Sequence, residues 1–253
     1  MNQESQVFNN ENSKDKYIES GAFIAKVFLY MFLGLLVSAL VCVGLSTIFS
    51  KLMGTSENFL PIYMIVMIVS GLGLLITSFV ISFKRIQMKN ILIPYLLYVT
   101  FSGALLSSFV YFVENPYIIG ISLAITSLIF LTTCLSAVIF KGRIGALFGI
   151  LFGGFITIAI LFVVNLFLLP WAFNVQSAFD ASMTICWVIE GIFVVMIIIS
   201  TFVDMYNIKK IASSAGNNSN LAIYYSMNLY CDFIMIFIRV LYFVILILGG
   251  KDK

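Results

Sequence analysis

The sequence predicts an all-α membrane protein with seven transmembrane helices and a cytoplasmic N-terminus, on three observations. Of the 253 residues, 62% are hydrophobic and 10% are charged, whereas a soluble globular chain carries about 25% charged residues. The apolar residues gather in runs long enough to cross a bilayer, and the charges gather between the runs. The period-two alternation of an outer-membrane barrel is absent. A water-soluble domain is therefore excluded, and helices are the expected way to cross the membrane.

Seven stretches reach the length of about 20 mostly apolar residues that the hydrocarbon core requires. In chain order, they are expected at Ala22–Phe49, Leu60–Phe83, Ile91–Val113, Tyr117–Phe140, Ile144–Leu169, Ala178–Val203 and Leu221–Leu248.

The first three stretches end where charged residues begin. The first runs from Ala22 and stops before Lys51. The second starts beside Pro61, a residue that the first turn of a helix tolerates, and stops before Lys84. The third stops before Glu114.

The other four stretches are bounded in the same way. The fourth starts after Pro116 and stops before Lys141, and the fifth stops before Pro170. The sixth runs up to Asp204, and the seventh starts after Asn220. All prolines of the chain lie at or near the ends of stretches, so seven continuous helices are expected rather than the broken helices of many transporters.

Lys and Arg residues are unequally divided between the two sides of the membrane. With the N-terminus inside, the inside segments hold Lys14, Lys16, Lys84, Arg85, Lys89, Lys141, Arg143, Lys209 and Lys210. The outside segments hold Lys51, Lys251 and Lys253. Because cytoplasmic segments carry the excess of Lys and Arg, this bias places the N-terminus in the cytoplasm and the C-terminus outside.

The two ends of the chain are polar. Residues 1–20 are rich in Asn, Glu, Ser and Lys and are expected to form a disordered cytoplasmic tail. Residues 21–250 then form one seven-helix domain, and residues 251–253 form a short C-terminal tail. The first apolar run is too long for the core of a signal peptide and is expected to be a permanent span. Short tails without a targeting segment favour the bacterial plasma membrane.

The composition also excludes several kinds of chemistry. The chain has no histidine, which excludes His-based acid–base catalysis, His-activated nucleophiles and His-ligated metals. The cysteines (Cys42, Cys134, Cys186 and Cys231) lie inside apolar runs without CxxC spacing, so buried apolar thiols are expected rather than disulfides or zinc ligands. Without a basic patch, nucleic acid is not an expected partner. Neither enzymatic activity nor a cofactor is expected, and the bilayer is the main partner.

The fifth stretch contains a ladder of small residues, Gly145, Gly149 and Gly153. Glycines four residues apart share one helix face and let a neighbouring helix approach closely. Packing inside the protein is the preferred interpretation of this ladder, and a homodimer face is the alternative.

Four ionisable residues lie inside or at the edge of the last two stretches: Glu190, Asp204, Asp232 and Arg239. A charge in lipid is costly, so such residues pair, face the bundle interior or line a wet path. We expect these two helices to end near Ile211 and Asn220. At 1.5 Å per residue along an antiparallel hairpin, Glu190 and Arg239 then reach matching heights of about 30 Å, which predicts an ion pair. Asp204 and Asp232 differ in height by about 7 Å on the same measure, a gap that tilt or an off-centre loop would close.

Two carboxylates brought together in a medium of low dielectric cannot both ionise cheaply, so Asp204 and Asp232 are expected to share a proton. Such a pair is a pH-sensitive latch near neutrality, and in its ionised form it offers oxygen ligands for transient binding of Ca²⁺. Arg85, near the cytoplasmic end of the second stretch, is placed to hold the pair shut. The alternative is that polar pairs simply hold helices together, which is the preferred interpretation for Glu190 and Arg239.

Two motifs resemble those of a known family. Residues 229–237 read LYCDFIMIF and resemble the L-Y-x-D-F-I-x-x-F signature in the last helix of the Bax inhibitor-1 (transmembrane Bax-inhibitor-motif) family. Asp204, followed by Ile208, resembles the D-x-x-x-I motif that ends the sixth helix of that family. Weaker matches are SGALLS at residues 102–107 and VNLF at residues 164–167, so the resemblance covers the chain from the first stretch to the last.

The resemblance implies a seven-helix fold with the last helix at the centre. It also implies a pH-dependent calcium leak, in which Asp204 and Asp232 form the sensor and an arginine of the second helix is the latch. Counting back without gaps from Gly103 assigns the latch to Arg85, with Lys84 as the fallback. Calcium is then the permeant ion and not a resident cofactor, and the role belongs to calcium homeostasis.

The chain departs from the family pattern at three places. No acidic residue lies between Leu60 and Phe83, where the family usually has a glutamate, and Tyr206 and Met235 stand where polar residues are common.

Two other functions stay open. One is a membrane regulator that transports nothing and binds a membrane protease or a stress or cell-death partner, with residues 1–20 as the contact. The other is an intramembrane aspartyl protease, which the lack of a GxGD motif around Asp204 or Asp232 disfavours.

Overall fold

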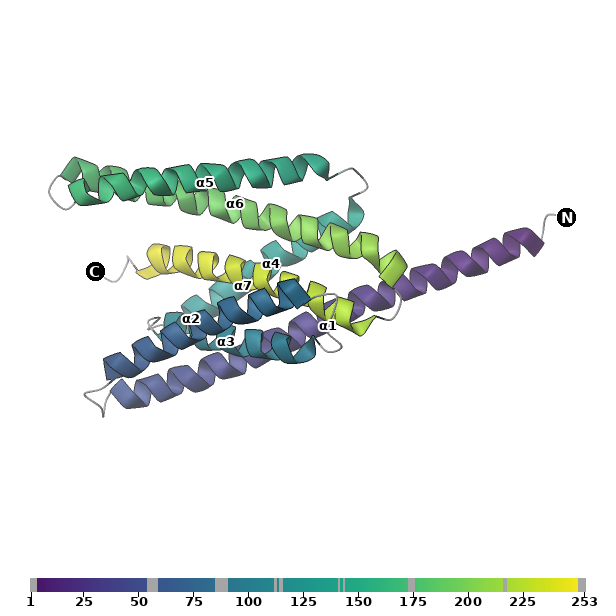
Figure 1. The fold of residues 1–253 in the computed structure, drawn as a ribbon, viewed down its shortest axis with the longest axis horizontal. Helices are drawn as coiled ribbons and strands as arrows, with labels where there is room; N and C mark the ends of the chain where they lie inside the picture. The colour runs from purple at the N-terminus through teal and green to yellow at the C-terminus, as the bar shows by residue number, and fades with distance from the viewer. Residues whose placement is uncertain are drawn as a thin grey trace. The chain divides into compact units, whose positions relative to one another are not determined.

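The computed structural model contains seven α-helices and, in the residues that it describes, no strand (Figure 1). The helices are α1 (Glu4–Met53), α2 (Phe59–Lys84), α3 (Leu92–Tyr111), α4 (Pro116–Ile139), α5 (Gly145–Ala172), α6 (Gln176–Ala215) and α7 (Ser219–Gly249). The structure describes residues 4–53, 59–84, 91–111, 113, 116–140, 142, 144–172, 176–215 and 218–249. Each helix contains a segment long and apolar enough to cross a membrane, so the predicted all-α membrane fold is confirmed. The orientation of the N-terminus stays a prediction.

One helix begins well before its predicted apolar stretch. α1 already begins at Glu4, so the backbone over 4–20 is helical where the composition predicts a disordered tail. Once the apolar stretch has nucleated a helix, each further residue adds one hydrogen bond, and polar residues can extend it. α6 ends at Ala215, close to the end near Ile211 that the sequence predicts, so Asp204 lies within the helix. The division of the chain into a tail and one domain stays a prediction.

Hydroxyl side chains within the helices form hydrogen bonds with their own backbone. Thr77 donates to the carbonyl oxygen of Gly73 at 2.7 Å, and Thr100 donates to that of Leu96 at 2.8 Å. Since lipid offers no partner for a polar group, these bonds within the helix let serine and threonine lie in an apolar span.

The chain packs as two compact units. Unit 1 comprises residues 1–120 and 207–231, and unit 2 comprises residues 121–206 and 232–253. α6 and α7 therefore contribute residues to both units. The buried share of the apolar window is 44% in both α3 and α7, the largest value of the seven helices. A high buried share is what an inner helix requires, while the central place of α7 stays a prediction.

In unit 1, α3 packs against both α1 and α2. Gly103 of α3 lies so close to α1 that a Cβ there would be 2.5 Å from the carbonyl oxygen of Ser38. Tyr95 of α3 fills the space beside Gly34 and donates a hydrogen bond to the carbonyl oxygen of Tyr30 at 2.8 Å. Small residues thus let α1 and α3 approach closely, and one tyrosine links their backbones.

The first part of α7 completes unit 1 with Tyr230, whose side chain is fully buried. Its ring packs edge-on against those of Tyr95 and Tyr98, with centroids 6.5 and 6.1 Å away. The hydroxyl of Tyr98 is also 3.0 Å from Sγ of Cys231. This part of the family-like motif therefore packs helices together.

In unit 2, α5 and α6 lie side by side (Figure 1). Ser182 of α6 donates to the Oδ1 atom of Asn165 at 2.6 Å, and the amide of Asn165 contacts Sγ of Cys186 at 3.2 Å. Gly154 of α5 makes room for the side chain of Met196 of α6. One polar side chain and one glycine thus hold this helix pair, in the way expected within a membrane.

The glycine ladder of α5 does not pack as the sequence predicts. A Cβ placed at Gly145, Gly149 or Gly153 would meet nothing within 4 Å. The close approach to α6 uses Gly154 instead, because the face of α5 that turns toward α6 lies one residue further around the helix. The preferred prediction, packing inside the protein, is therefore wrong for the ladder, and a homodimer face at these residues stays a prediction.

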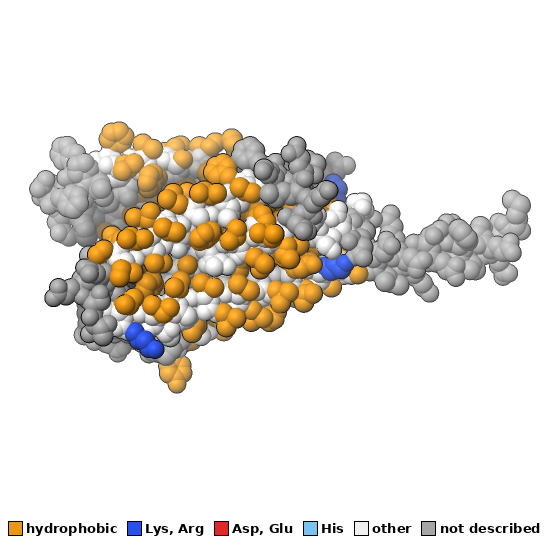
Figure 2. Space-filling model, turned by 60° about the horizontal axis from the view of Figure 1, so that its bottom comes forward, with side chains coloured by type: hydrophobic (Ala, Val, Ile, Leu, Met, Phe, Trp, Pro, Cys, Tyr) orange, Lys and Arg blue, Asp and Glu red, His pale blue; other side chains and the backbone are white. Residues whose placement is uncertain are grey.

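The surface between the helix ends is apolar. Figure 2 shows hydrophobic side chains over most of the described face in view, with Lys and Arg side chains near its margins. Among the exposed residues are Leu40 and Phe152, with 75% and 71% of their surface accessible. An apolar surface of this extent on a soluble protein would drive aggregation, whereas in a bilayer it faces lipid. The chain is an integral membrane protein.

The contact of α1 with Gly103 leads to a first prediction. Gly103→Ala places a methyl group against the Ser38 backbone, and overpacking of this kind costs about 1–3 kcal/mol. We expect a lower unfolding midpoint in micelles, measured by thermal or denaturant unfolding. Gly44→Ala is the control, because a Cβ there meets nothing within 4 Å. Equal midpoints for the two variants would show that α1 and α3 do not pack at this point.

Candidate functional site

The two aspartates singled out by the sequence both belong to unit 2, one on α6 and one on α7. Asp232 is buried with 3% of its surface exposed, and Asp204 is half-buried. Their carboxyl groups interact electrostatically. The direct pairing of the two carboxyls, for which the sequence left a gap in height, stays a prediction.

Thr201 joins this pair, and sequence reasoning missed it. It precedes Asp204 by three residues and so shares its face of α6. The Thr201 hydroxyl lies within hydrogen-bonding reach of the Asp232 carboxyl. It also donates a hydrogen bond to the carbonyl oxygen of Ile197 at 2.9 Å. Thr201 is thus a polar neighbour of Asp232 on α6.

The rest of the Asp232 environment is apolar or unpaired. Its Oδ2 atom is buried and has no hydrogen-bond partner among the described residues. Cys134 of α4 interacts electrostatically with the carboxyl. Beside Asp232, the ring of Phe233 packs edge-on against that of Phe130 at 5.4 Å. An ionised carboxylate without partners is costly in such surroundings, so its charge state depends on a neighbour or an ion.

No simple sequence signal leads to Cys134. It lies about a hundred residues before Asp232, and only the packing of α4 on α7 in unit 2 brings it near that side chain. Thr201 is different, because its spacing of three residues from Asp204 is a signal that was present in the sequence.

No group of three or more potential metal-ligating side chains occurs in the described part of the chain. The expectation that calcium passes as the permeant ion and is not a resident cofactor stays a prediction.

Glu190 and Arg239 form the ion pair that the sequence predicts. The Nη1 atom of Arg239 contacts both carboxylate oxygens of Glu190 and links α6 to α7 within unit 2. The guanidinium also lies over the ring of Phe193, 4.6 Å from its centroid. The two charged side chains keep 28% and 23% of their surface exposed. Each charge thus has a partner at a depth where lipid would offer none.

The predicted latch cannot be placed. Arg85 lies outside the described residues, and only the backbone of Lys84, at the end of α2, is described. The assignment of the latch to Arg85, with Lys84 as the fallback, stays a prediction.

The ion pair leads to a second prediction. Glu190→Gln or Arg239→Gln leaves one charge without a partner among apolar side chains, at a cost on the order of 2–3 kcal/mol. We expect each single variant to lower the free energy of unfolding in micelles, and the double variant to lose less than the sum of the two. A double-mutant cycle measures this coupling. Strictly additive losses would mean that the two side chains do not interact.

Comparison with known proteins agrees with the two motifs. The family model described as inhibitor of apoptosis-promoting Bax1 (Bax1-I) matches residues 21–252, which include α2 to α7 and both aspartates. No curated protein and no solved structure shows significant similarity to the chain. Because the match spans nearly the whole chain, the protein belongs to the Bax inhibitor-1-like family of membrane proteins.

Proposed function

We propose that this protein is a passive, pH-dependent leak for calcium in the bacterial plasma membrane, gated by Asp204 and Asp232. The observation that carries the proposal is a buried carboxyl, Asp232, which interacts with a second carboxyl on another helix of the same unit. A polar pair at this depth is costly, and ionisable residues within spans usually mark ion or proton pathways.

The proposed closed state holds one proton between the two carboxyls. The burial of Asp232 supports this state, because a buried carboxyl without a counter-ion is less costly when it is neutral. Arg85 is proposed as the cation that holds the protonated pair shut.

The proposed open state follows loss of the shared proton. Two negative charges in a medium of low dielectric repel one another and push α6 and α7 apart near Asp204 and Asp232. The same ionised oxygens attract a divalent cation. Since a rise in pH removes the proton, calcium flux increases with pH, by up to about tenfold per pH unit for one controlling proton.

Asp232→Asn tests the sensor. An amide cannot lose a proton, so we expect calcium flux into proteoliposomes to stay near the low-pH value of the wild type at every pH. The measurement is the initial rate of calcium entry between about pH 5 and 8. Asp204→Asn is expected to do the same, because the repulsion needs both carboxylates.

Two controls make this result specific. Asp232→Glu keeps a carboxyl that can titrate and should retain a rise of flux with pH. Ser226→Ala removes a buried hydroxyl from unit 1 of the same helix and should leave the flux unchanged. A wild-type pH profile in Asp232→Asn would rule out the di-aspartyl sensor.

Deletion of residues 1–20 separates the leak from a regulator that transports nothing. The deleted segment contains neither aspartate of the pair, so a leak should keep its calcium flux and pH profile in proteoliposomes. A regulator that contacts its protease or stress partner through this segment should show no flux in either form and lose its cellular phenotype on deletion. Loss of flux on deletion would contradict the gate proposed for Asp204 and Asp232.

A further inference from the structure

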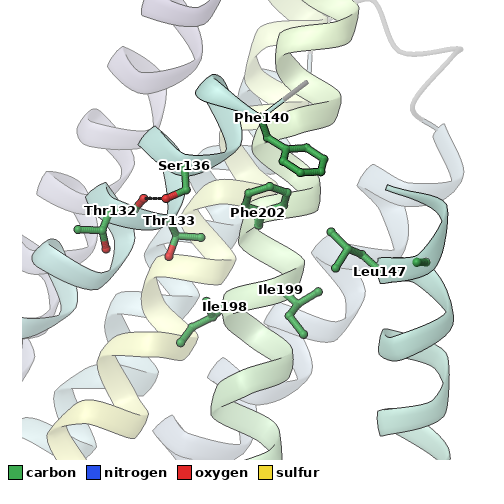
Figure 3. A pocket seen from close by; sticks show the side chains of 9 residues that line it. Thr132, Thr133, Ser136, Phe140, Leu147, Ile198, Ile199 and Phe202 are labelled. Atoms are coloured by element: carbon green, nitrogen blue, oxygen red, sulfur yellow. Dashed lines mark hydrogen bonds between the residues drawn. The ribbon is translucent and has the colours of Figure 1, made fainter. Parts of the chain in front are cut away.

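A pocket of about 650 Å³ lies in unit 2 between α4, α5 and α6 (Figure 3). This volume is in the range of sites that bind small molecules and lipids. Its polar groups are the hydroxyls of Thr132, Thr133 and Ser136, all on α4, and the rest of its wall is apolar. Among the described residues, no charged side chain lines it. The pocket is separate from the ion pair between Glu190 and Arg239. Binding of a ligand in this pocket does not depend on the proposed calcium leak.

The three hydroxyls present acceptors to the pocket and no donors. Thr132 and Thr133 donate to the carbonyl oxygen of Ile129 at 2.9 and 2.7 Å, and Ser136 donates to that of Thr132 at 2.7 Å. Because each hydroxyl has a single hydrogen, which is already engaged, its oxygen can only accept a hydrogen bond from a ligand. A ligand in this pocket therefore gains hydrogen bonds only if it brings donors of its own.

One end of the pocket is closed by aromatic rings near the end of α4. Phe140 packs edge-on against Phe202 of α6, with the ring centroids 5.4 Å apart (Figure 3). The Phe140 ring also covers Gly142, whose carbonyl oxygen accepts a hydrogen bond from Tyr206 at 3.2 Å. Since α4 ends at Ile139, this closed end lies where the helices reach the membrane surface.

The outer face of α4 shows that the pocket adjoins lipid. Leu128, Leu131 and Leu135 expose 67%, 57% and 60% of their surface, as residues in contact with acyl chains do. The helix that supplies the hydroxyls of the pocket therefore also contacts lipid, which makes a membrane lipid the natural ligand for it.

The charges in the sequence next to Gly142 favour one class of lipid headgroup over the others. In the sequence, Lys141 and Arg143 flank Gly142, so the loop at the closed end carries two positive charges. Their side chains are outside the described residues and form no part of the pocket. Basic residues next to a span attract anionic headgroups and repel an ammonium group.

We propose that this pocket binds a membrane phospholipid with an anionic headgroup that carries hydroxyl donors, such as phosphatidylglycerol. Its headgroup hydroxyls donate to the oxygens of Ser136 and Thr133. One acyl chain packs on the apolar wall formed by α5 and α6, including Ile199. This assigns the protein a lipid site in addition to the carboxylate pair.

Lipid binding to the full-length protein in micelles tests the proposal. Native mass spectrometry is used to compare phosphatidylglycerol, phosphatidylethanolamine and phosphatidylcholine with identical acyl chains, and the first is expected to bind most tightly. Thr133→Val and Ser136→Ala should each lower its affinity about fivefold, the factor for one hydrogen bond. Ile199→Trp fills the pocket and should abolish the bound lipid.

Matched controls separate the pocket from the general lipid surface. Thr157→Val removes a hydroxyl that also bonds within its own helix, at 2.9 Å to Gly153, and lies exposed outside the pocket. Leu135→Trp adds comparable bulk to Ile199→Trp on an exposed face. Both controls should bind phosphatidylglycerol like the wild type, and unfolding midpoints of all variants verify that they fold.

Two results would overturn the proposal. If Ile199→Trp folds and still retains the lipid, the pocket is not the binding site. If phosphatidylcholine or phosphatidylethanolamine binds as tightly as phosphatidylglycerol, the assignment of an anionic headgroup with hydroxyl donors is wrong.

Discussion

The absence of water from the bilayer interior is the constraint on which this structure depends. A polar group in that region must find its partner within the protein, because lipid supplies none. Thr77 and Thr100 meet this requirement with carbonyl groups of their own helices. Glu190 meets it with Arg239 on the next helix. Asp232, with one carboxylate oxygen unpaired among the described residues, does not meet it fully, and this exception marks the candidate site.

Much of the fold follows from the sequence because the bilayer reduces the choice of structure to helices of known minimum length. The predicted stretch Ile91–Val113 corresponds to α3 at Leu92–Tyr111, and Leu221–Leu248 corresponds to α7 at Ser219–Gly249. The helix ends outside the membrane follow less well, since apolarity no longer marks them there. α1, for example, already begins at Glu4, well before its predicted apolar stretch starts at Ala22.

The candidate site was predictable only in part. The pairing of Glu190 with Arg239 follows from simple arithmetic, because a short turn fixes the register of an antiparallel hairpin. The same arithmetic leaves Asp204 and Asp232 apart, since it ignores the tilt and rotation of helices. The glycine ladder shows the same limit, because sequence spacing does not reveal how a helix is rotated toward its neighbour. Its spacing identifies a smooth face on α5, but side-chain packing against α6 selects the neighbouring Gly154.

In unit 2, α6 contributes side chains to two different environments, the surroundings of the Asp232 carboxyl and the pocket. Thr201 and Asp204 lie toward the buried carboxyl of α7, whereas Ile198, Ile199 and Phe202 line the pocket. Residues 201 and 202 are neighbours in the chain but point to different sides because successive helical residues are about 100° apart. A single helix thereby separates a site that needs burial from one that adjoins lipid.

The ion pair between α6 and α7 also bears on how the protein enters the membrane during synthesis. Glu190 is made 49 residues before Arg239, so α6 emerges from the ribosome without its counter-ion. A lone charge at the centre of a span costs roughly 2.5–3.5 kcal/mol on insertion. Entry of the two helices together as a hairpin removes most of this cost, because the charges neutralise one another before either meets lipid. The ion pair between Glu190 and Arg239 thus favours a route of insertion in which the last two helices enter the membrane together.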